Sequence, residues 1–161
     1  MIVPSDIEHL KTIAPGRILG IDFGEKRIGL ALSDPFQMTA SPLETVANRN
    51  TEASVAQIAE TAQRHSARAL VIGRPLHMSG EVSAMCLKVE AFAQQLAEAL
   101  ADTPIFFWDE RWSTAGAEKI LIETGRSPSR NRQKIDQVAA AYMLTGFLQR
   151  LDVLKRSADA E

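Results

Sequence analysis

A change in hydrophobic period partway along the chain constrains the fold more than any other feature of the sequence. Before the change, the apolar, β-prone runs Arg17–Phe23 and Arg27–Ser33 are joined by a short loop that contains Gly24, which predicts a β-hairpin. A third strand near Leu43–Ala47 would complete a meander. After the change, Thr51–His65 carries apolar residues at helical spacing, and continuous apolar runs then alternate with further helices. We therefore expect one sheet with antiparallel strands first and parallel strands after.

The predicted order of elements, βββαβαβα, is typical of an α/β fold with a mixed five-stranded sheet and helices on both faces. A short helix over Asp6–Ile13 precedes the meander. The chain has no internal repeat or long linker, so we expect an N-terminal extension over residues 1–16, one domain over 17–151 and a polar tail over 152–161. After the first long helix, the predicted elements are strands at Ala69–Gly73 and Ile105–Trp108 and helices at Glu81–Leu100, Ser113–Thr124 and Gln133–Leu151.

Composition narrows the class of protein. The 161 residues are 45% apolar and 24% charged, and the formal net charge of −2 suits an ordinary globular domain. A single cysteine, Cys86, and three scattered histidines disfavour a disulfide framework and a zinc site with nitrogen and sulfur ligands. Asp6 and Glu8 interrupt any apolar leader, and no run approaches the ~20 apolar residues of a membrane span. We expect a cytoplasmic protein with no membrane partner, and any metal would be a hard, oxygen-bound cation.

Two acidic residues stand on faces where acids are unexpected. Strand alternation puts Asp22 on the same face as Gly20, and the next strand presents Gly29, so this face would leave room for a ligand beside a carboxylate. Asp136 heads the apolar stripe of the last predicted helix and would point toward the core, where an isolated charge is too costly. Two simpler interpretations stay open. Asp22 could open a turn in which Gly24 takes a positive φ, and Asp136 could cap its helix.

A third acidic position follows the last predicted strand, at Asp109 and Glu110. Reactive groups collect at the carboxyl ends of strands in open α/β sheets. Only one of these neighbours can share a face with Asp22, and we favour Glu110, with Asp109 in reserve. An ion pair with Arg111 would also explain an acid there. Three converging carboxylates, Asp22, Glu110 and Asp136, would suit magnesium or manganese, and two such ions would activate a water and support the leaving oxygen of a phosphodiester.

Basic residues gather beside these acids in the sequence. The loop Gly125–Lys134 contains no acid, and its arginine forks match phosphate oxygens, although it could equally be a solvated surface. A second loop follows Arg74 at a strand end and could cradle a phosphate, although turn chemistry alone explains its Pro75 and Gly80. The candidate nucleic-acid contacts are Lys26, Arg27, Arg74, Arg111, Arg126, Arg130, Arg132 and Lys134.

Four segments, taken together, resemble the YqgF/RuvX family of small bacterial proteins. They occur in the family order and span about Arg17 to Leu148, and they are Leu19–Asp34, Val71–Gly80, Asp109–Ala115 and Lys134–Ala141. The resemblance implies a ribonuclease-H-like three-layer fold and an acidic active site at Asp22, Glu110 and Asp136. It also implies a metal-dependent endonuclease that trims the 5′ end of precursor 16S rRNA in the cytoplasm. Resolution of Holliday junctions is the older assignment for the same chemistry.

Two features depart from the family pattern. Arg74 stands where an apolar residue, usually leucine, is expected, and residues 1–16 have no counterpart. Other classes of protein fit parts of the sequence. Gly20–Gly24 and the hairpin resemble the phosphate loop of sugar kinases and actin-like ATPases, but 161 residues leave no second domain to close over ATP. A further alternative is an assembly factor that binds RNA without cleaving it. A junction resolvase would need two active sites related by a twofold axis, which makes a homodimer a partner to test.

Overall fold

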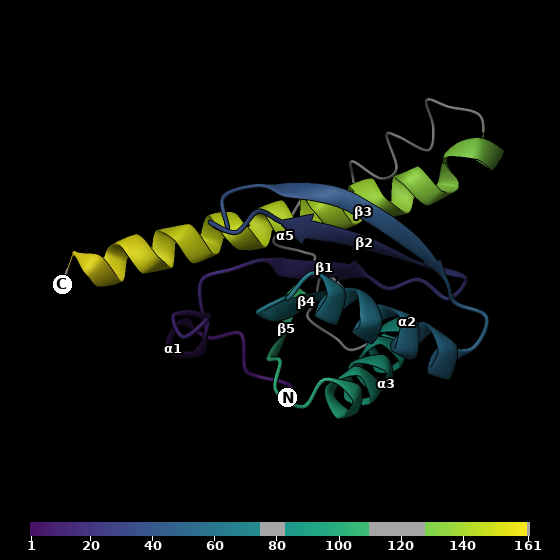
Figure 1. The fold of residues 1–161 in the computed structure, drawn as a ribbon, viewed down its shortest axis with the longest axis horizontal. Helices are drawn as coiled ribbons and strands as arrows, with labels where there is room; N and C mark the ends of the chain where they lie inside the picture. The colour runs from purple at the N-terminus through teal and green to yellow at the C-terminus, as the bar shows by residue number, and fades with distance from the viewer. Residues whose placement is uncertain (75–82, 110–127, 161) are drawn as a thin grey trace.

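The computed structural model describes residues 1–74, 83–109 and 128–160, with residues 128–133 described by their backbone alone. Its centre is a five-stranded sheet in the order β3-β2-β1-β4-β5 (Figure 1). β1 pairs antiparallel with β2, and β2 with β3, whereas β4 and β5 continue in parallel with β1. The predicted mixed sheet is therefore confirmed. Its strands are β1 (Ile18–Asp22), β2 (Arg27–Ser33), β3 (Ala40–Ala47), β4 (Ala69–Arg74) and β5 (Ile105–Asp109).

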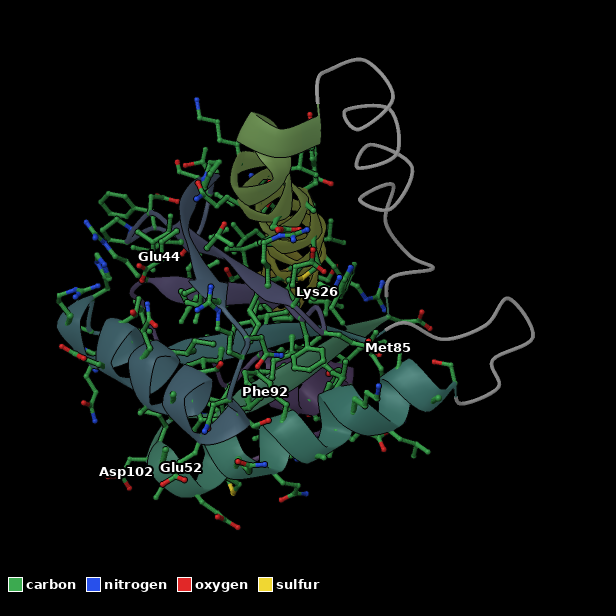
Figure 2. All side chains as sticks on the ribbon, turned by 90° about the vertical axis from the view of Figure 1, so that its right-hand side faces the viewer. Lys26, Glu44, Glu52, Met85, Phe92 and Asp102 are labelled. Carbon is green, nitrogen blue, oxygen red and sulfur yellow. The ribbon has the colours of Figure 1, made fainter. Side chains whose placement is uncertain are left out.

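Helices cover both faces of the sheet, as the α/β prediction requires. α5 lies along one face, and α2 and α3 lie together on the other (Figure 1). Because side chains alternate along a strand, each face of the sheet has its own hydrophobic cluster. Ile18 packs in the cluster that contains Leu144 of α5, and its neighbour Leu19 packs in the cluster that contains Phe92 of α3. Figure 2 shows Phe92 between α3 and the sheet. The helices are α1 (Ile7–Leu10), α2 (Thr51–Arg64), α3 (Ala84–Ala99) and α5 (Pro128–Asp159).

Glycines on the sheet let α5 approach the strands closely. A Cβ built on Gly20 would lie 3.0 Å from the Leu144 Cβ, and one built on Gly29 would lie 2.0 Å from the Asp136 carbonyl oxygen. The expectation that these glycines leave room for a ligand is therefore wrong where α5 covers them. The missing side chains make room for the backbone of a helix instead.

The last helix is longer than predicted at both ends. It begins at Pro128 rather than Gln133, so residues 128–134 of the predicted loop are helical. Proline suits the first turn of a helix because the amide it lacks would have no partner there. The helix also continues through residues 152–159, which we expected to form a polar tail, and it buries Leu154 in the core beneath it. Among the described residues, no helix combines the length and the apolar character needed to cross a membrane.

The N-terminal residues are packed against the domain rather than appended to it. Asp6 caps α1 by accepting the His9 amide, and the helix is shorter than the predicted span Asp6–Ile13. Leu10 and Ile13 are buried in the cluster under α5, and a parallel bridge joins Ile2 to Ile105 of β5. The segment before β1 therefore covers the β5 edge of the sheet and part of its core.

Two other boundaries differ, and one prediction lies beyond the structure. β3 begins at Ala40 rather than near Leu43 and pairs with β2 through a register shift. α3 begins at Ala84 rather than Glu81, because Ser83 caps it by accepting the Cys86 amide at 3.1 Å. The predicted helix Ser113–Thr124 lies outside the described residues.

The loop from β2 to β3 is held by polar contacts at the end of the sheet where β1 begins. Both Asp34 carboxylate oxygens accept backbone amides, from Phe36 at 3.1 Å and from Met38 and Thr39 at 2.7 and 2.8 Å. Gln37 adopts a φ of +60°, and its buried amide donates to the Gly16 carbonyl and accepts from Lys155 of α5 at 3.0 Å. The far end of α5 is thereby tied to this loop.

Candidate active site

Asp22 and Asp136 meet at one glycine. Asp22 ends β1, and its Cα partner in β2 is Gly29. Residues directly opposite each other in an antiparallel pair share a face of the sheet. α5 places the Asp136 backbone against Gly29, where a side chain would otherwise stand. Two acids that are distant in sequence are thus brought together at the carboxyl end of β1.

The structure does not support helix capping by Asp136 or a positive φ at Gly24. Asp136 lies inside α5 rather than before it, so it does not cap the helix. It is only 4% exposed, which agrees with the prediction that it points toward the core. Gly24 does not adopt a positive φ, and its Cβ would lie 2.3 Å from the Arg27 carbonyl oxygen, so a close approach within the hairpin explains this glycine.

Arg27 compensates the buried carboxylate of Asp136. Its Nε donates to Asp136 Oδ2 at 2.7 Å, and the side chains are 33% and 6% exposed, respectively. Arg27 stands two residues before Gly29 on β2, so alternation puts it on the same face. Asp22, Arg27 and Asp136 therefore lie around Gly29, and Arg27 supplies the cation for Asp136. The sequence predicted Arg27 only as a contact to nucleic acid.

Asp109 faces the other side of the sheet. On β5, Phe106 and Trp108 pack in the cluster under α5, whereas Ile105 and Phe107 pack against the cluster under α2 and α3. Alternation assigns Asp109 to this second series, away from Asp22. The structure therefore does not bring the reserve acid to the face that carries Asp22 and Asp136. The favoured acid, Glu110, lies outside the described residues.

Arg74 also points away from the two acids. Its guanidinium forms an ion pair with Glu90 of α3, donates from Nε to Cys86 Sγ at 3.2 Å and lies 5.6 Å from the centre of the Phe107 ring. The hydrogen bond to Cys86, followed by the interaction with Glu90, holds the pKa of Arg74 above its usual value. The residue that departs from the family pattern thus ties β4 to α3.

The other predicted nucleic-acid contacts are divided between described and undescribed parts of the chain. Lys26, in the hairpin after β1 (Figure 2), and Lys134, in α5, are both exposed near the acids. Arg130 and Arg132 belong to the part of α5 that is described by its backbone alone. Arg111 and Arg126 lie outside the described residues.

The chemistry of this site fits a hard divalent cation. Asp22 and Asp136 offer carboxylate oxygens, the ligands that Mg²⁺ and Mn²⁺ prefer. Within residues 1–74, 83–109 and 128–160, no group of three histidine, cysteine or acidic residues is close enough to hold a metal ion. A third acidic ligand would therefore come from outside these ranges, where Glu110 is the predicted candidate.

A pocket that the sequence did not predict lies on the other side of the sheet at the end of β1. Phe23, the residue after Asp22, lines it together with Asn48 and Arg49 from the β3–α2 connection and Lys88 from α3. The predicted meander could have indicated it, because the first and third strands of a meander end at the same edge of the sheet. The residues that follow these two strands therefore lie close together. The identity of these side chains alone did not indicate a pocket.

Comparison with known proteins identifies a family and relatives for this chain. The model of the family described as "RuvX: Holliday junction resolvase" matches residues 16–150. A Moorella thermoacetica protein named "Putative pre-16S rRNA nuclease" is 44% identical over 135 residues, which cover 84% of this chain and 96% of that protein. A Roseobacter denitrificans protein of the same name is 38% identical over the whole of both chains.

Solved structures support the fold. Thermus thermophilus RuvC in complex with a Holliday junction substrate has a TM-score of 0.54 at 17% identity, covering 84% of this chain and 96% of that one. RuvC from the same organism solved in another structure has a TM-score of 0.51. The predicted α/β fold of the ribonuclease-H-like type is confirmed. Because the family model matches residues 16–150 and these relatives are 38–44% identical, the chain belongs to the RuvX (YqgF) family.

Proposed function

We propose that this chain is a metal-dependent endonuclease that processes the 5′ end of precursor 16S rRNA during ribosome assembly. The observation that carries the proposal is the meeting of Asp22 and Asp136 at Gly29, at the carboxyl end of β1. The names of the relatives at 38–44% identity favour precursor rRNA as the substrate. A phosphodiester hydrolase is the class of enzyme that fits both observations.

In this proposal, Asp22, Asp136 and Glu110 hold two Mg²⁺ or Mn²⁺ ions. Such ions would activate a water and support the leaving oxygen of the phosphodiester. The chain itself positions the acids. α5 fixes Asp136 through its backbone contact with Gly29, and Arg27 orients the Asp136 carboxylate through the 2.7 Å hydrogen bond. Because Asp136 is buried between α5 and the sheet, its orientation is set by the fold and not by solvent.

Substrate binding in this proposal relies on local cations. The net charge of −2 gives the chain no overall attraction to nucleic acid, so affinity would come from patches near the acids. Lys26 and Lys134 are exposed there, and Arg111, Arg126, Arg130 and Arg132 complete the predicted set. We leave Arg74 out of this set, because it is engaged with Glu90 and Cys86 on the other face.

A Holliday junction resolvase is the second candidate, and the description of the matching family favours it. This candidate requires two active sites related by a twofold axis, hence a homodimer. A non-catalytic RNA-binding assembly factor is the third, and it would keep its affinity when the acids are removed.

The test compares two substrates under defined metal conditions. Purified protein is incubated with a labelled precursor 16S 5′-end RNA or a mobile four-way DNA junction, with magnesium, manganese or a chelator. Asp22→Asn is the inactive variant. Asp102→Asn is the matched control, since Asp102 is an exposed acid in the connection from α3 to β5, at the opposite end of α3 from Met85 (Figure 2).

Metal-dependent cleavage of the RNA alone, lost in Asp22→Asn and kept in Asp102→Asn, is the expected result. Cleavage of the junction alone, by a dimer, would favour the resolvase. If neither substrate is cut and Asp22→Asn binds RNA as well as the wild type does, the assembly factor becomes the better account.

A further inference from the structure

A pocket lies on the face of the sheet opposite Asp136, beside the end of β1. Its volume is about 320 Å³, within the range of small-molecule sites. We call it the β1-end pocket and define it by five of its lining residues: Phe23, Asn48, Arg49, Lys88 and Gln95. The hairpin after β1, the β3–α2 connection and α3 form its walls. None of its lining residues belongs to the acidic site.

Hydrogen bonds hold one wall of the β1-end pocket in place. Asn48 donates from Nδ2 to the Gly24 carbonyl at 2.9 Å, and its Oδ1 accepts from the Ser54 hydroxyl at 3.0 Å. The backbone N–H of Asn48 also donates to the Lys26 carbonyl at 2.9 Å. The β3–α2 connection is thus fixed to the hairpin that follows Asp22. A pocket whose wall is fixed in this way is formed before any ligand arrives.

An ion pair closes the pocket on the side of α3. Lys88 Nζ lies 2.6 Å from Glu25 Oε1, and both side chains are more than half exposed. The hydrogen bond from Lys88 lowers the pKa of the Glu25 carboxyl. The contact joins the hairpin to α3 across the mouth of the pocket. Because it is exposed, an incoming phosphate can compete for Lys88 at little cost.

An aromatic ring and a second cation complete the pocket. The Phe23 ring lies 4.9 Å from the ring of Phe92, which is 1% exposed, so Phe23 is anchored on the core while remaining half-buried at the pocket. Arg49 is exposed and forms no ion pair with any residue that the structure describes. The pocket therefore combines a fixed aromatic surface, side-chain amides from Asn48 and Gln95, and two cations at its rim.

We propose that the β1-end pocket binds an unpaired nucleobase next to the scissile phosphate of the substrate. Stacking on an aromatic ring combined with cations along the backbone is the general way in which proteins hold single-stranded nucleic acid. Asp22 and Phe23 are consecutive, so their Cα atoms are about 3.8 Å apart while their side chains face opposite sides of the sheet. A strand with one phosphate at Asp22 can therefore place the adjacent base at Phe23. This inference rests on the proposed nuclease function.

In this arrangement each lining group has a defined part. Phe23 stacks on the base, the side-chain amide of Gln95 hydrogen-bonds to its edge, and Arg49 and Lys88 contact the flanking phosphate. The substrate must then be unpaired beside the cut. The pocket would select RNA ends and loops over a continuous duplex, since a paired base cannot leave its stack without a cost.

The test uses fluorescence so that binding is measured apart from cleavage. Oligonucleotides that span the precursor 16S 5′ end carry 2-aminopurine at one position at a time and are titrated with protein without added divalent metal. Quenching at a single position beside the cut is expected for the wild type. Phe23→Leu should abolish that quenching and weaken binding roughly tenfold. Arg49→Gln should weaken binding and reduce the slope of log affinity against log salt by about 0.7.

The controls distinguish loss of the pocket from loss of positive charge elsewhere and from loss of stability. Arg68→Gln removes an exposed arginine just before β4, at the opposite end of the sheet, and should leave both quenching and salt slope unchanged. Urea unfolding checks each variant. Arg49→Gln, an exposed substitution, keeps the test valid if Phe23→Leu does not fold.

The outcomes distinguish this proposal from the nuclease function. Cleavage of the unmodified RNA is measured in parallel with magnesium. If the RNA is cut and no position is quenched, or if quenching persists unchanged in Phe23→Leu, the pocket proposal is overturned and the nuclease stands. If one position is quenched through Phe23 and no RNA is cut, the pocket binds a base and the nuclease proposal fails instead.

Discussion

The carbonyl oxygen of Asp136 lies 2.0 Å from the point where a Cβ of Gly29 would stand. No real Cβ tolerates a backbone atom at that distance, so α5 can reach β2 only because residue 29 is glycine. The position of the Asp136 carboxylate therefore depends on a contact between two backbones. The side chains around it are a secondary support.

Gly29→Ala should displace α5 from the sheet. Relieving a clash of this size in a packed interface costs about 1–3 kcal/mol, and we expect the free energy of unfolding to fall by that amount in urea titrations. Cleavage should fall further than stability, because the displaced helix carries Asp136. Gly20→Ala is the matched control: its Cβ would lie 3.0 Å from the Leu144 Cβ, a milder contact than the 2.0 Å contact at Gly29, so its losses should be smaller. Equal behaviour of the two variants would contradict this account.

Arg27→Met should destabilise the protein by leaving the buried Asp136 carboxylate without its cation. Removing one partner of a largely buried charged hydrogen bond costs about 1–3 kcal/mol, measurable by urea unfolding. Asp136→Asn should cost less, since an amide oxygen can still accept from the Arg27 Nε. The second variant should nevertheless lose cleavage entirely. Wild-type turnover in Asp136→Asn would remove this residue from the proposed active site.

The Asp34 loop should make stability depend on pH in the acid range. Backbone amides, with that of Thr39 first, lower the pKa of Asp34 below its usual value. The stabilisation is therefore complete above the usual pKa of about 4 and is lost as the pH falls through the lowered value. Asp34→Asn should be less stable than the wild type at pH 7, and the difference should shrink as the pH falls below about 4. A difference that stays constant down to pH 2.5 would show that the charge of Asp34 does not contribute.

Deleting residues 152–161 should destabilise the domain although these residues are mostly polar. The deletion removes the buried Leu154 and the contact from Lys155 to Gln37, which together contribute about 2–4 kcal/mol. Arg156→Gln is a suitable comparison, because its ion pair with Asp152 is exposed and should contribute little. Thermal or urea unfolding measures both. A truncated chain as stable as the full one would restore the expectation of a polar tail that lies outside the domain.

Replacing Arg126, Arg130 and Arg132 together with glutamine should weaken RNA binding and make it less dependent on salt. Each phosphate contact on a single strand contributes about 0.7 to the slope of log affinity against log salt. If all three contact phosphates, the slope should fall by about 2, as measured by titration at several salt concentrations. An unchanged slope would mean that these arginines form only a solvated surface.

The sequence predicted the sheet and the face on which Asp22 lies better than it predicted the helix that packs on that face. Alternation in β1 and β2 assigned Asp22 and Gly29 to one face, and the structure confirms that sharing. Alternation shows which residues share a face of the sheet but not what packs on that face. Gly20 and Gly29 were therefore interpreted as a ligand platform, whereas they accommodate α5. The partner of Arg27 could not be predicted for the same reason, because Asp136 is brought to it by tertiary packing.

Helix ends were predicted less well because their signals were weak or ambiguous. Pro128 and its serine neighbours were interpreted as a loop, yet proline is also favoured in the first helical turn. At the other end, the polar residues 152–161 were interpreted as a tail. The helix continues because Leu154 and Lys155 reach the core and the Gln37 loop, which only the folded structure brings near.

α5 contacts the sheet at two fixed points, Asp136 over Gly29 and Leu144 over Gly20. A helix turns by about 100° with each residue, so one inserted or deleted residue between these points would rotate one contact away from its glycine. The eight-residue spacing must therefore be kept in any relative that uses both contacts. Changes in chain length should be tolerated only outside Asp136–Leu144. A related sequence can therefore be tested for both contacts by counting the residues between the positions of Asp136 and Leu144.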